Sequence, residues 1–538
     1  MAKGFFSKYL PLVLLGGLLL TGLVTIFVQA DNYGITLDEP QQDAYGHAVM
    51  EWYATLGRDT SFLSGFPNDA NLPEHGGIFD AVIAAVQQLF PPSEHWHVRR
   101  IVTALSGLLG LVVLAFCGYE LGMGSYWMAF LAALALWLYP RYYGAIYNNS
   151  KDIPAAVATM LVLWVSLIFI KQWAQKKHFI RNSVLLGLCI GIAAAIRVTA
   201  VIWYLILGLF VTGWWLFWGK RLWQENKARA ELIRQAIAAA IIGVVSFLTM
   251  MLLWPYMFLN PFKNLLHSMR VMSQYPWNGT VLYNGVVVPA THLPRTYAPE
   301  WLIIGSPPTL ILFALVGFGI ACFWAVKKQM IDPGISLVLL SFILPLGTIV
   351  GLHSVLYDAL RQFLFLVPSL ILIAVYGFVQ IVNYLGTRKQ RTLRWAAAGL
   401  VVLTLTSYTL VLKEMVDLSP FEYTYFSPVV GGLPGAAGKF ETDYWGTCTL
   451  QAKEWLLQNY RHYTDSSNPS VEIRAYEFPS GGPLSMPGFH EVNAAPDFYI
   501  ASTRYKLDQQ YPVYRTIHVV AAEGVPLCVI KARPTLQP

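Results

Sequence analysis

Two adjacent carboxylic acids, Asp38 and Glu39, follow the first long apolar run of the sequence. A carboxylate within hydrogen-bond reach of an attacking hydroxyl can accept its proton, so the pair is a candidate general base. A structural role is also open, because Thr36 and Glu39 have capping-box spacing and acidic residues stabilise the first turn of a helix. The two roles are compatible, since a capped helix start would hold Asp38 rigidly.

Four basic residues are candidates for binding an anion: Arg141, Lys151, Arg197 and Arg361. Arginine offers a planar fork that matches phosphate, and lysine offers a point charge. Arg197 interrupts an apolar stretch, where two short helices or one broken helix would place it near a membrane surface, and such a charge is a functional candidate by default. Cations grouped beside an apolar groove would suit a lipid phosphate.

The same polar segments also allow structural roles. Arg141 could extend its charged end to the membrane interface, and Arg197 could pair with a carboxylate elsewhere in the chain. Asp358 and Arg361 have the i, i+3 spacing of a helical ion pair. Asp152 fits an N-cap, with a proline following in the first turn of the helix.

Histidines and cysteines give weaker indications. His95 and His97 have ligand-like spacing, but no compact run of further metal ligands follows them, so interfacial histidines are the favoured interpretation. Cys448 and Cys528 both lie in the C-terminal region, where either a disulfide or two free thiols would be consistent with the sequence.

Long apolar helices must position these residues. Hydrophobic residues make up 56% of the chain and charged residues only 12%, which is incompatible with an ordinary soluble surface. Eleven apolar runs are candidates to cross a bilayer. They are 10–30, 101–118, 123–140, 154–170, 183–196, 200–218, 235–255, 307–326, 335–352, 362–383 and 395–413. The sequence therefore predicts an all-α polytopic membrane bundle of about eleven helices, with a transmembrane module over 1–413.

The distribution of Lys and Arg predicts the orientation. Short connecting segments rich in these residues alternate with long segments that nearly lack them. The basic segments are 171–181, 220–234, 327–328 and 388–394, and the long segments are 31–98 and 256–305. The positive-inside rule then places the N-terminus in the cytoplasm and the tail 414–538 outside. The net charge of +7 is accordingly a topology signal, and no nucleic-acid partner is inferred from it.

Two of the polar regions have recognisable periodicity. In segment 31–98, Tyr45, Val49 and Trp52 recur at helical spacing, as do apolar residues between 79 and 90, which predicts two amphipathic helices at the membrane interface. In the tail, alternating stretches such as Ser470–Tyr476 and Arg515–Val520 predict strands, and hence a small α/β extracytoplasmic domain over 414–538.

Four motifs taken together resemble a known family. They are Asp38-Glu39, Tyr147–Pro154, Tyr357–Phe365 and Phe440–Gly446. These motifs resemble bacterial glycosyltransferases of the GT-C fold, and most closely the group related to protein O-mannosyltransferases and the lipid A aminoarabinose transferase. The resemblance covers nearly the whole chain, from the helices and the amphipathic first loop to the outer C-terminal domain.

The resemblance implies a mechanism and a set of roles. A sugar on a polyprenyl phosphate would be transferred with inversion in one displacement, on the non-cytoplasmic face of the inner (plasma) membrane. Asp38 would be the catalytic base and Glu39 its acidic partner. Arg141, Lys151, Arg197 and Arg361 would bind the donor phosphate. Tyr147, Asn148, Tyr357 and Asp358 would contact the sugar or the acceptor.

Other parts of the site are less defined by the resemblance. It implies no protein-bound metal and no certain cofactor, leaves a divalent cation open, and leaves the acceptor open among protein, lipid and glycan. Where the family often has a phosphate-binding basic residue in the first outer loop, this chain has Glu74-His75-Gly76-Gly77, and Arg99 and Arg100 could compensate.

A transporter or flippase for a lipid-linked sugar is the alternative function. Transporters usually place charged residues near the membrane midplane and contain internal repeats. Here the charged motifs are predicted at one membrane face and no repeat is evident, so the sequence favours the transferase.

Overall fold

Ten long helices form a bundle. The computed structural model describes residues 2–64, 66, 71–175, 177–328, 332–475 and 486–536. Ten of the helices in these ranges are long and apolar enough to cross a membrane, where only an internally hydrogen-bonded backbone is tolerated. They are α1 (Ala2–Gln29), α4 (His95–Leu121), α7 (Asp152–Ala174), α8 (Phe179–Ile196), α9 (Ile202–Gln224), α10 (Ala228–Leu253), α14 (Pro308–Lys328), α15 (Pro333–Gly351), α16 (Val367–Gly386) and α17 (Arg391–Leu418). The predicted boundary after residue 413 falls within α17.

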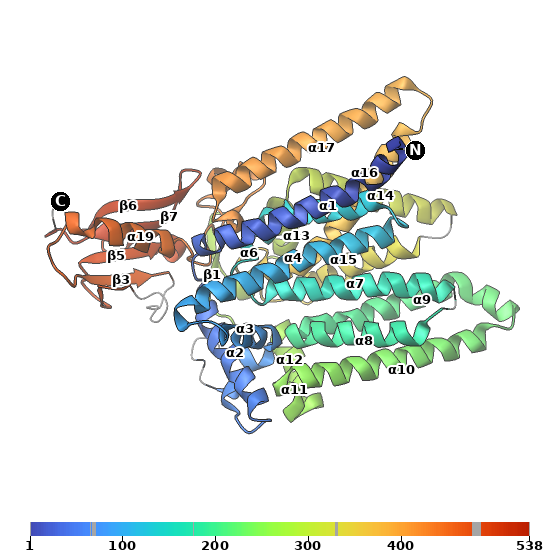
Figure 1. Cartoon of the computed structure of the whole chain (residues 1–538), viewed down its shortest axis with the longest axis horizontal. Helices are drawn as coiled ribbons and strands as arrows, with labels where there is room; N and C mark the ends of the chain where they lie inside the picture. Colours follow the sequence, from blue (N-terminus) through green and yellow to red (C-terminus); the bar gives the residue numbers. More distant parts are fainter. Residues whose placement is uncertain are drawn as a thin grey trace.

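The remaining apolar run, 123–140, forms a shorter broken helix. Its first part, α5 (Tyr126–Trp137), has 12 residues, and Pro140 then begins α6 (Pro140–Ala145). Tyr139 is extended because the residue before a proline is disfavoured in the helical region. Since α4 and α7 run in the same direction in Figure 1, the α5–α6 segment must return the chain. All six residues of α6 are buried, so the break is enclosed by protein.

The helices also break at Arg197, as the sequence predicts. α8 ends at Ile196, Arg197 is extended (φ −147°, ψ 124°), and a 3₁₀ turn (Val198–Val201) leads into α9. The guanidinium thus lies at the junction of two helices, at the bundle end nearest the C-terminal domain.

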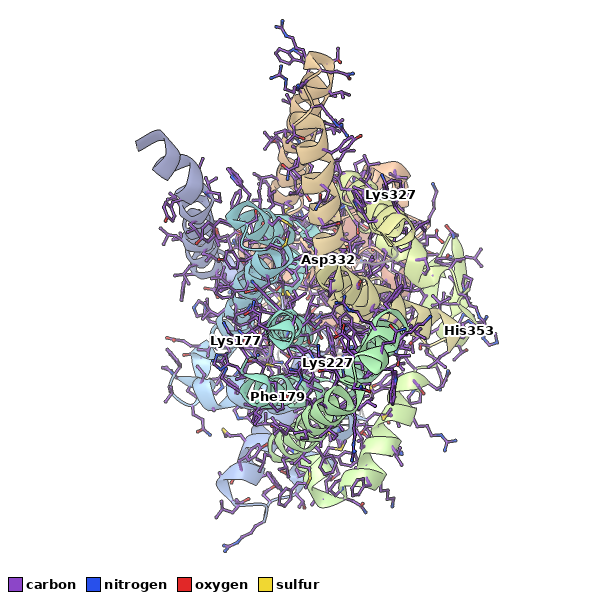
Figure 2. All side chains as sticks on the ribbon, turned by 90° about the vertical axis from the view of Figure 1, so that its right-hand side faces the viewer. Lys177, Phe179, Lys227, Lys327, Asp332 and His353 are labelled. Atoms are coloured by element: carbon purple, nitrogen blue, oxygen red, sulfur yellow. A yellow bond between two sulfur atoms is a disulfide. The ribbon has the colours of Figure 1, made fainter. Side chains whose placement is uncertain are left out.

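Basic residues gather at the opposite end of the bundle. Figure 2 views this end and shows Lys177, Lys227 and Lys327 at the turns between long helices. The predicted basic connections therefore lie at one end of the bundle, and the long segments that nearly lack Lys and Arg lie at the other (Figure 1). Lys176, in one of these turns, lies outside the described residues.

The first polar region contains the two predicted amphipathic helices. They are α2 (Glu39–Ala54) and α3 (Ile78–Gln87), which pack against each other. Tyr45, Val49 and Trp52 face a small separate core, whereas Leu56 is 90% exposed at the end of the helix. Such a sided arrangement is typical of helices at a membrane interface.

The second polar region folds over the same end of the bundle. It contains α11 (Pro255–Leu259), α12 (Pro261–Ser273), the antiparallel hairpin β1 (Thr280–Tyr283) and β2 (Val286–Pro289), and α13 (Tyr297–Ile304). Gly285 donates its backbone N–H to Lys439, which joins the hairpin to the chain entering the C-terminal domain.

The C-terminal domain is a five-stranded mixed sheet with a helix against it. The strand order is β4-β3-β5-β7-β6, and β3 runs parallel to both β4 and β5. The elements are α18 (Gly432–Ala436), α19 (Thr449–Asn459), β3 (Ser470–Arg474), β4 (His490–Glu491), β5 (Phe498–Ser502), β6 (Arg515–Ala522) and β7 (Val525–Ala532). The predicted α/β tail is confirmed, with strands in both predicted stretches, Ser470–Tyr476 and Arg515–Val520. Tyr476 itself lies outside the described residues.

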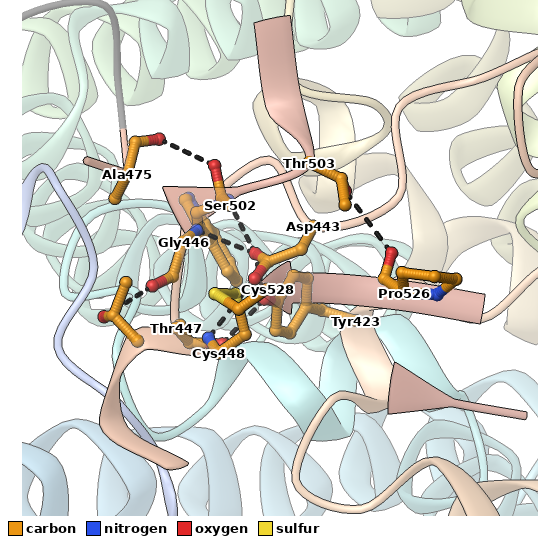
Figure 3. The surroundings of a disulfide bond; sticks show 12 residues. Tyr423, Asp443, Gly446, Thr447, Cys448, Ala475, Ser502, Thr503, Pro526 and Cys528 are labelled. Atoms are coloured by element: carbon orange, nitrogen blue, oxygen red, sulfur yellow. Dashed lines mark hydrogen bonds between the residues drawn. A yellow bond between two sulfur atoms is a disulfide. The ribbon is translucent and has the colours of Figure 1, made fainter. Parts of the chain in front are cut away.

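A disulfide between Cys448 and Cys528 joins the start of α19 to β7 (Figure 3). The preceding turn is organised by Asp443, whose carboxylate accepts the backbone N–H groups of Trp445, Gly446 and Cys448. The motif Phe440–Gly446 therefore has a structural function, since it fixes the entry of the chain into the domain. The sequence left either a disulfide or two free thiols open at these positions, and the structure contains the disulfide.

Candidate active site

A polar cavity lies at the bundle end that bears the C-terminal domain. Its empty volume, counted to its mouth, is about 600 Å³. Its charged and titratable lining residues are Asp38, His75, Lys151, Asp152, Arg197, Arg361, Tyr275 and Tyr357, and its remaining lining residues are Leu37, Gln41, Gln42, Leu72, Asn149 and Gln362. The fold thus brings together the predicted base and three of the four predicted cations, from segments more than 300 residues apart.

Asp38 is the carboxylate that faces the cavity. Its side chain is 41% exposed and forms an ion pair with Arg361. Burial in the protein acts to raise the pKa of Asp38, but the attractions of Arg361, Lys151 and Arg504 outweigh it, and the pKa is lowered. Asp38 is therefore ionised at neutral pH and able to accept a proton.

Glu39 points away from the cavity. It is 1% exposed, accepts the backbone N–H of Thr36 at 2.7 Å, and lies 3.6 Å from Nε of Arg99. Burial raises the pKa of Glu39 to about 7, against the attraction of Arg99. Half of the predicted capping box is present: the Glu39 carboxylate accepts the Thr36 N–H and so holds the chain before α2 beside Asp38. The N-cap, however, is Asp38 rather than Thr36, and it makes no side-chain cap bond.

Arg99 and Arg100 do not replace the missing basic residue of the first loop. Arg99 is buried and donates to Asp80 (2.9 Å) and Ser150 (2.7 Å), and Arg100 donates to Asp31 (3.2 Å). Neither lines the cavity. Arg99 instead links α4 to the first polar region and to the chain before α7.

The segment that leads into α7 supplies three cavity residues, Asn149, Lys151 and Asp152. The predicted N-cap role of Asp152 is wrong in detail: Asp152 is the first residue of α7, and its backbone N–H donates to the side chain of Asn149 at 2.8 Å. This leaves the Asp152 carboxylate available to Arg197, 2.9 Å away. Arg197 therefore has the carboxylate partner that the structural interpretation proposed, and it lines the cavity as well.

His75 is a cavity residue that no motif singled out. It is 7% exposed. Burial, followed by the repulsion of Lys151, Arg197 and Arg361, holds its pKa well below the ordinary value. Gly76 makes this placement possible, because a Cβ there would lie 1.6 Å from the backbone oxygen of Ala195. The available signal was the Glu74-His75-Gly76-Gly77 segment in place of a basic residue.

Aromatic rings form one wall of the cavity. Tyr357 stacks on Trp277 with ring centroids 4.2 Å apart, and Tyr275 lies next to both Tyr357 and His75. Tyr357 was a predicted contact for sugar or acceptor, and its position in the lining is compatible with that role. Tyr275 and Trp277 come from the second polar region, where no motif marks them.

Besides Glu39, four predicted site residues lie outside the cavity. Arg141 is buried between the rings of Trp301 and Phe426, 4.9 Å from each centroid. Its predicted extension to the interface is wrong, because the residue is enclosed under the C-terminal domain. The others are Tyr147, which stacks on Tyr33; Asn148, which donates to the Gly34 carbonyl; and Asp358, which pairs with Arg361 at 2.8 Å as its i, i+3 spacing predicts.

A second, mainly apolar cavity adjoins the first and shares Arg197 with it. It is a narrow crevice with room for little more than a single water molecule. Its other lining residues come from α7, α8, α15 and the chain around the start of α9, and include Ala155, Ala193, Ile202, Trp203, Ile206, Pro345 and Phe365. The polar cavity and the apolar crevice therefore share one residue, Arg197.

Groups of three or more metal-ligating side chains do not occur among the described residues. His97 contacts Asp31 at 2.8 Å, and His95 stacks on His47.

Comparison with known proteins tests the predicted fold. No protein-family model matches the sequence, and no curated protein is significantly similar to it. Among solved structures, the chain aligns over 100% of both chains with ArnT from Cupriavidus metallidurans bound to undecaprenyl phosphate, at 15% identity and a TM-score of 0.48. It also aligns with the Archaeoglobus fulgidus oligosaccharyltransferase tethered with an acceptor peptide, at 11% identity and a TM-score of 0.52, over 87% of this chain and 62% of that one. The chain therefore has the GT-C fold of membrane glycosyltransferases that its motifs predict.

Proposed function

We propose that the protein is a membrane glycosyltransferase that moves a sugar from a polyprenyl phosphate to an acceptor hydroxyl, with Asp38 as the base. The observation that carries the proposal is the junction of the two cavities at Arg197. The polar cavity has the cations that a phosphate needs, and the narrow apolar crevice beside Arg197 marks the direction in which the lipid chain of the same molecule would leave it.

The reaction follows from the charges in the cavity. The acceptor oxygen attacks the anomeric carbon, the bond from that carbon to the phosphate oxygen breaks, and the hydroxyl proton passes to Asp38. The phosphate leaves with one more negative charge than it had in the donor. Lys151, Arg197 and Arg361, fixed around the cavity, would stabilise this charge as it develops. Attack from the side opposite the phosphate inverts the anomeric carbon.

The reaction would take place on the non-cytoplasmic face of the inner membrane. The basic turns at the far end of the bundle support this orientation by the positive-inside rule. The C-terminal domain would then lie outside, beside the cavity, where an exported acceptor of protein, lipid or glycan could reach Asp38. The aromatic wall of Tyr275 and Tyr357 would contact a sugar ring.

Substitution of Asp38 tests the proposal. In vesicles supplied with polyprenyl-phosphate sugars, Asp38→Asn should lower the rate of transfer by about 100-fold or more, because the amide cannot accept the proton. Asp43→Asn is the matched control, since Asp43 lies in the same helix but pairs with Arg99 and Gln87 outside the cavity. Normal transfer by Asp38→Asn would refute the role of base. Translocation of the lipid-linked sugar without any transfer by the wild type would indicate the flippase instead.

A further inference from the structure

The C-terminal domain reaches the cavity through a chain of ion pairs. Arg361 binds Asp38 through one guanidinium nitrogen and Asp358 through another, the latter at 2.8 Å. The second oxygen of Asp358 accepts a bond from Arg504 of the C-terminal domain at 2.6 Å. Arg504 in turn lies 3.3 Å from Glu441. Opposite charges therefore alternate along five residues, from the candidate base to the domain.

The members behind Asp38 are shielded from water. The side chains of Arg361, Asp358, Arg504 and Glu441 are between 4% and 12% exposed. Charges interact strongly in such surroundings, and the removal of one partner leaves its neighbour uncompensated. A substitution at Arg504 is therefore expected to change the ion pairs that Arg361 makes.

The backbone at Asp358 depends on the same contacts. Asp358 and Ala359 have φ angles of 55° and 62°, in the left-handed region that residues other than glycine seldom adopt. Such conformations persist where the surroundings fix them. Two arginines hold the Asp358 carboxylate here, one from each side, and Arg504 also donates to the backbone oxygen of Tyr444 at 2.6 Å.

We propose that Arg504 is a positioning residue which, by binding Asp358, leaves Arg361 available to hold Asp38. The C-terminal domain would thereby control the proton affinity of the cavity carboxylate. The role of Asp38 as a base rests on the function proposed above. The connection from Arg504 to Asp38 through ion pairs does not depend on that function.

The direction of the effect follows from competition. Without Arg504, Asp358 and Asp38 compete for Arg361, so the attraction that lowers the pKa of Asp38 weakens and burial has more weight. The pKa of Asp38 should then rise. Arg504 also attracts Asp38 directly, and the loss of this attraction acts in the same direction. Lys151 attracts Asp38 too, and the other charged or titratable groups lining the cavity are His75, Asp152, Arg197, Tyr275 and Tyr357. These groups are unchanged by a substitution at Arg504.

The test measures the protonation of Asp38 directly in the full-length protein. Carbodiimide labelling of Asp38 is followed by mass spectrometry as a function of pH. In Arg504→Gln, the labelling midpoint should move to higher pH, by less than the shift of about one unit or more expected if Arg361 itself, the cation in contact with Asp38, were removed. Arg533→Gln is the matched control, because Arg533 lies in the same domain but pairs with Asp497 at 3.4 Å and contacts none of the five ion-paired residues. Its midpoint should equal that of the wild type.

A double substitution tests the route. In an Asp358→Asn background, Arg504→Gln should cause less than half of the shift that it causes alone, because its connection to Arg361 is already cut. Melting temperatures identify any variant that fails to fold. Should Arg504→Gln not fold, Arg504→Lys, whose ammonium cannot hold Asp358 and Tyr444 together, should move the midpoint in the same direction by a smaller amount. An unmoved midpoint in the variant that folds overturns the proposal.

The labelling experiment needs no sugar transfer. A wild-type protein without transferase activity would refute the proposed function while leaving this test intact. In an active protein, the acid limb of the pH profile of kcat/KM should follow the labelling midpoint in each variant.

Discussion

His75 is the residue of the cavity whose charge depends most on what the cavity holds. It is neutral at pH 7, because burial and then the three surrounding cations oppose its protonation. An anion bound among Lys151, Arg197 and Arg361 would cancel that repulsion. The imidazole would then take up a proton and become a fourth positive group against the ligand.

This coupling predicts a pH-dependent affinity. The protonated form of His75 favours the bound anion, so the affinity of the wild type for polyprenyl phosphate, relative to His75→Gln, should rise as the pH falls through the pKa of His75 in the complex toward the low pKa of the free protein. A rise of about tenfold corresponds to one unit of difference between the free and bound pKa values. Binding measured by calorimetry at several pH values checks this, and the variant corrects for titration of the phosphate itself. Parallel pH dependences in the two proteins would contradict the prediction.

The sequence predicted the charged centre of the site better than its surroundings. Asp38, Lys151, Arg197 and Arg361 were found because charges beside apolar runs are uncommon and have few uses. Arg141 satisfies the same criterion, yet tertiary packing places it outside the cavity. Arg504 could not be found at all, since its partner Asp358 is 146 residues away and no local pattern records that contact.

At the scale of the elements, the loop before α3 packs closely against the bundle at Gly76, where a Cβ would lie nearer to another atom than at any other described glycine. Gly76 touches the backbone of Ala195 at the end of α8, which brings His75 next to Arg197. Any side chain at position 76 would push the loop away from the bundle, and with it one wall of the cavity.

Gly76→Ala should therefore destabilise the protein by about 1–3 kcal/mol, as overpacking does in other tightly packed sites, and should lower transfer activity. Gly208→Ala is the comparison, because a Cβ at Gly208 in α9 meets no atom within 4 Å. Thermal unfolding in detergent measures both. Equal melting temperatures for Gly76→Ala and the wild type would show that the loop can move without cost.

Helices were more predictable than their ends. A long apolar run must form a helix wherever lipid surrounds it, so the ten long helices follow from hydropathy alone. The break at Arg197 was foreseen because a charge interrupts the run. The shortness of α5 was not, because hydropathy cannot distinguish an apolar segment that faces lipid from one that faces protein.

At the scale of the whole molecule, the disulfide between Cys448 and Cys528 bears on the orientation proposed above. Disulfides form and persist in oxidising compartments, which agrees with a domain outside the cytoplasm. The bond closes a long segment of the chain, with 80 residues of separation, and cross-links of that length stabilise a fold by about 4 kcal/mol in the chain-entropy model.

Two outcomes are expected from this bond. In intact cells, Cys448 and Cys528 should resist alkylation until a reductant is added, and the reductant should lower the unfolding temperature of the domain. The Cys448→Ala, Cys528→Ala double variant should melt at the lower temperature with or without reductant. Free thiols at both positions in freshly harvested cells would argue for a cytoplasmic domain.

The broken α5–α6 segment has a consequence for how the protein is assembled. A 12-residue helix is about 18 Å long, well short of a bilayer core of about 30 Å. Lipid alone cannot satisfy the backbone groups at its ends. We expect α5 and α6 to settle only after α4 and α7 are in place, so the closing of the bundle is a late event in biogenesis.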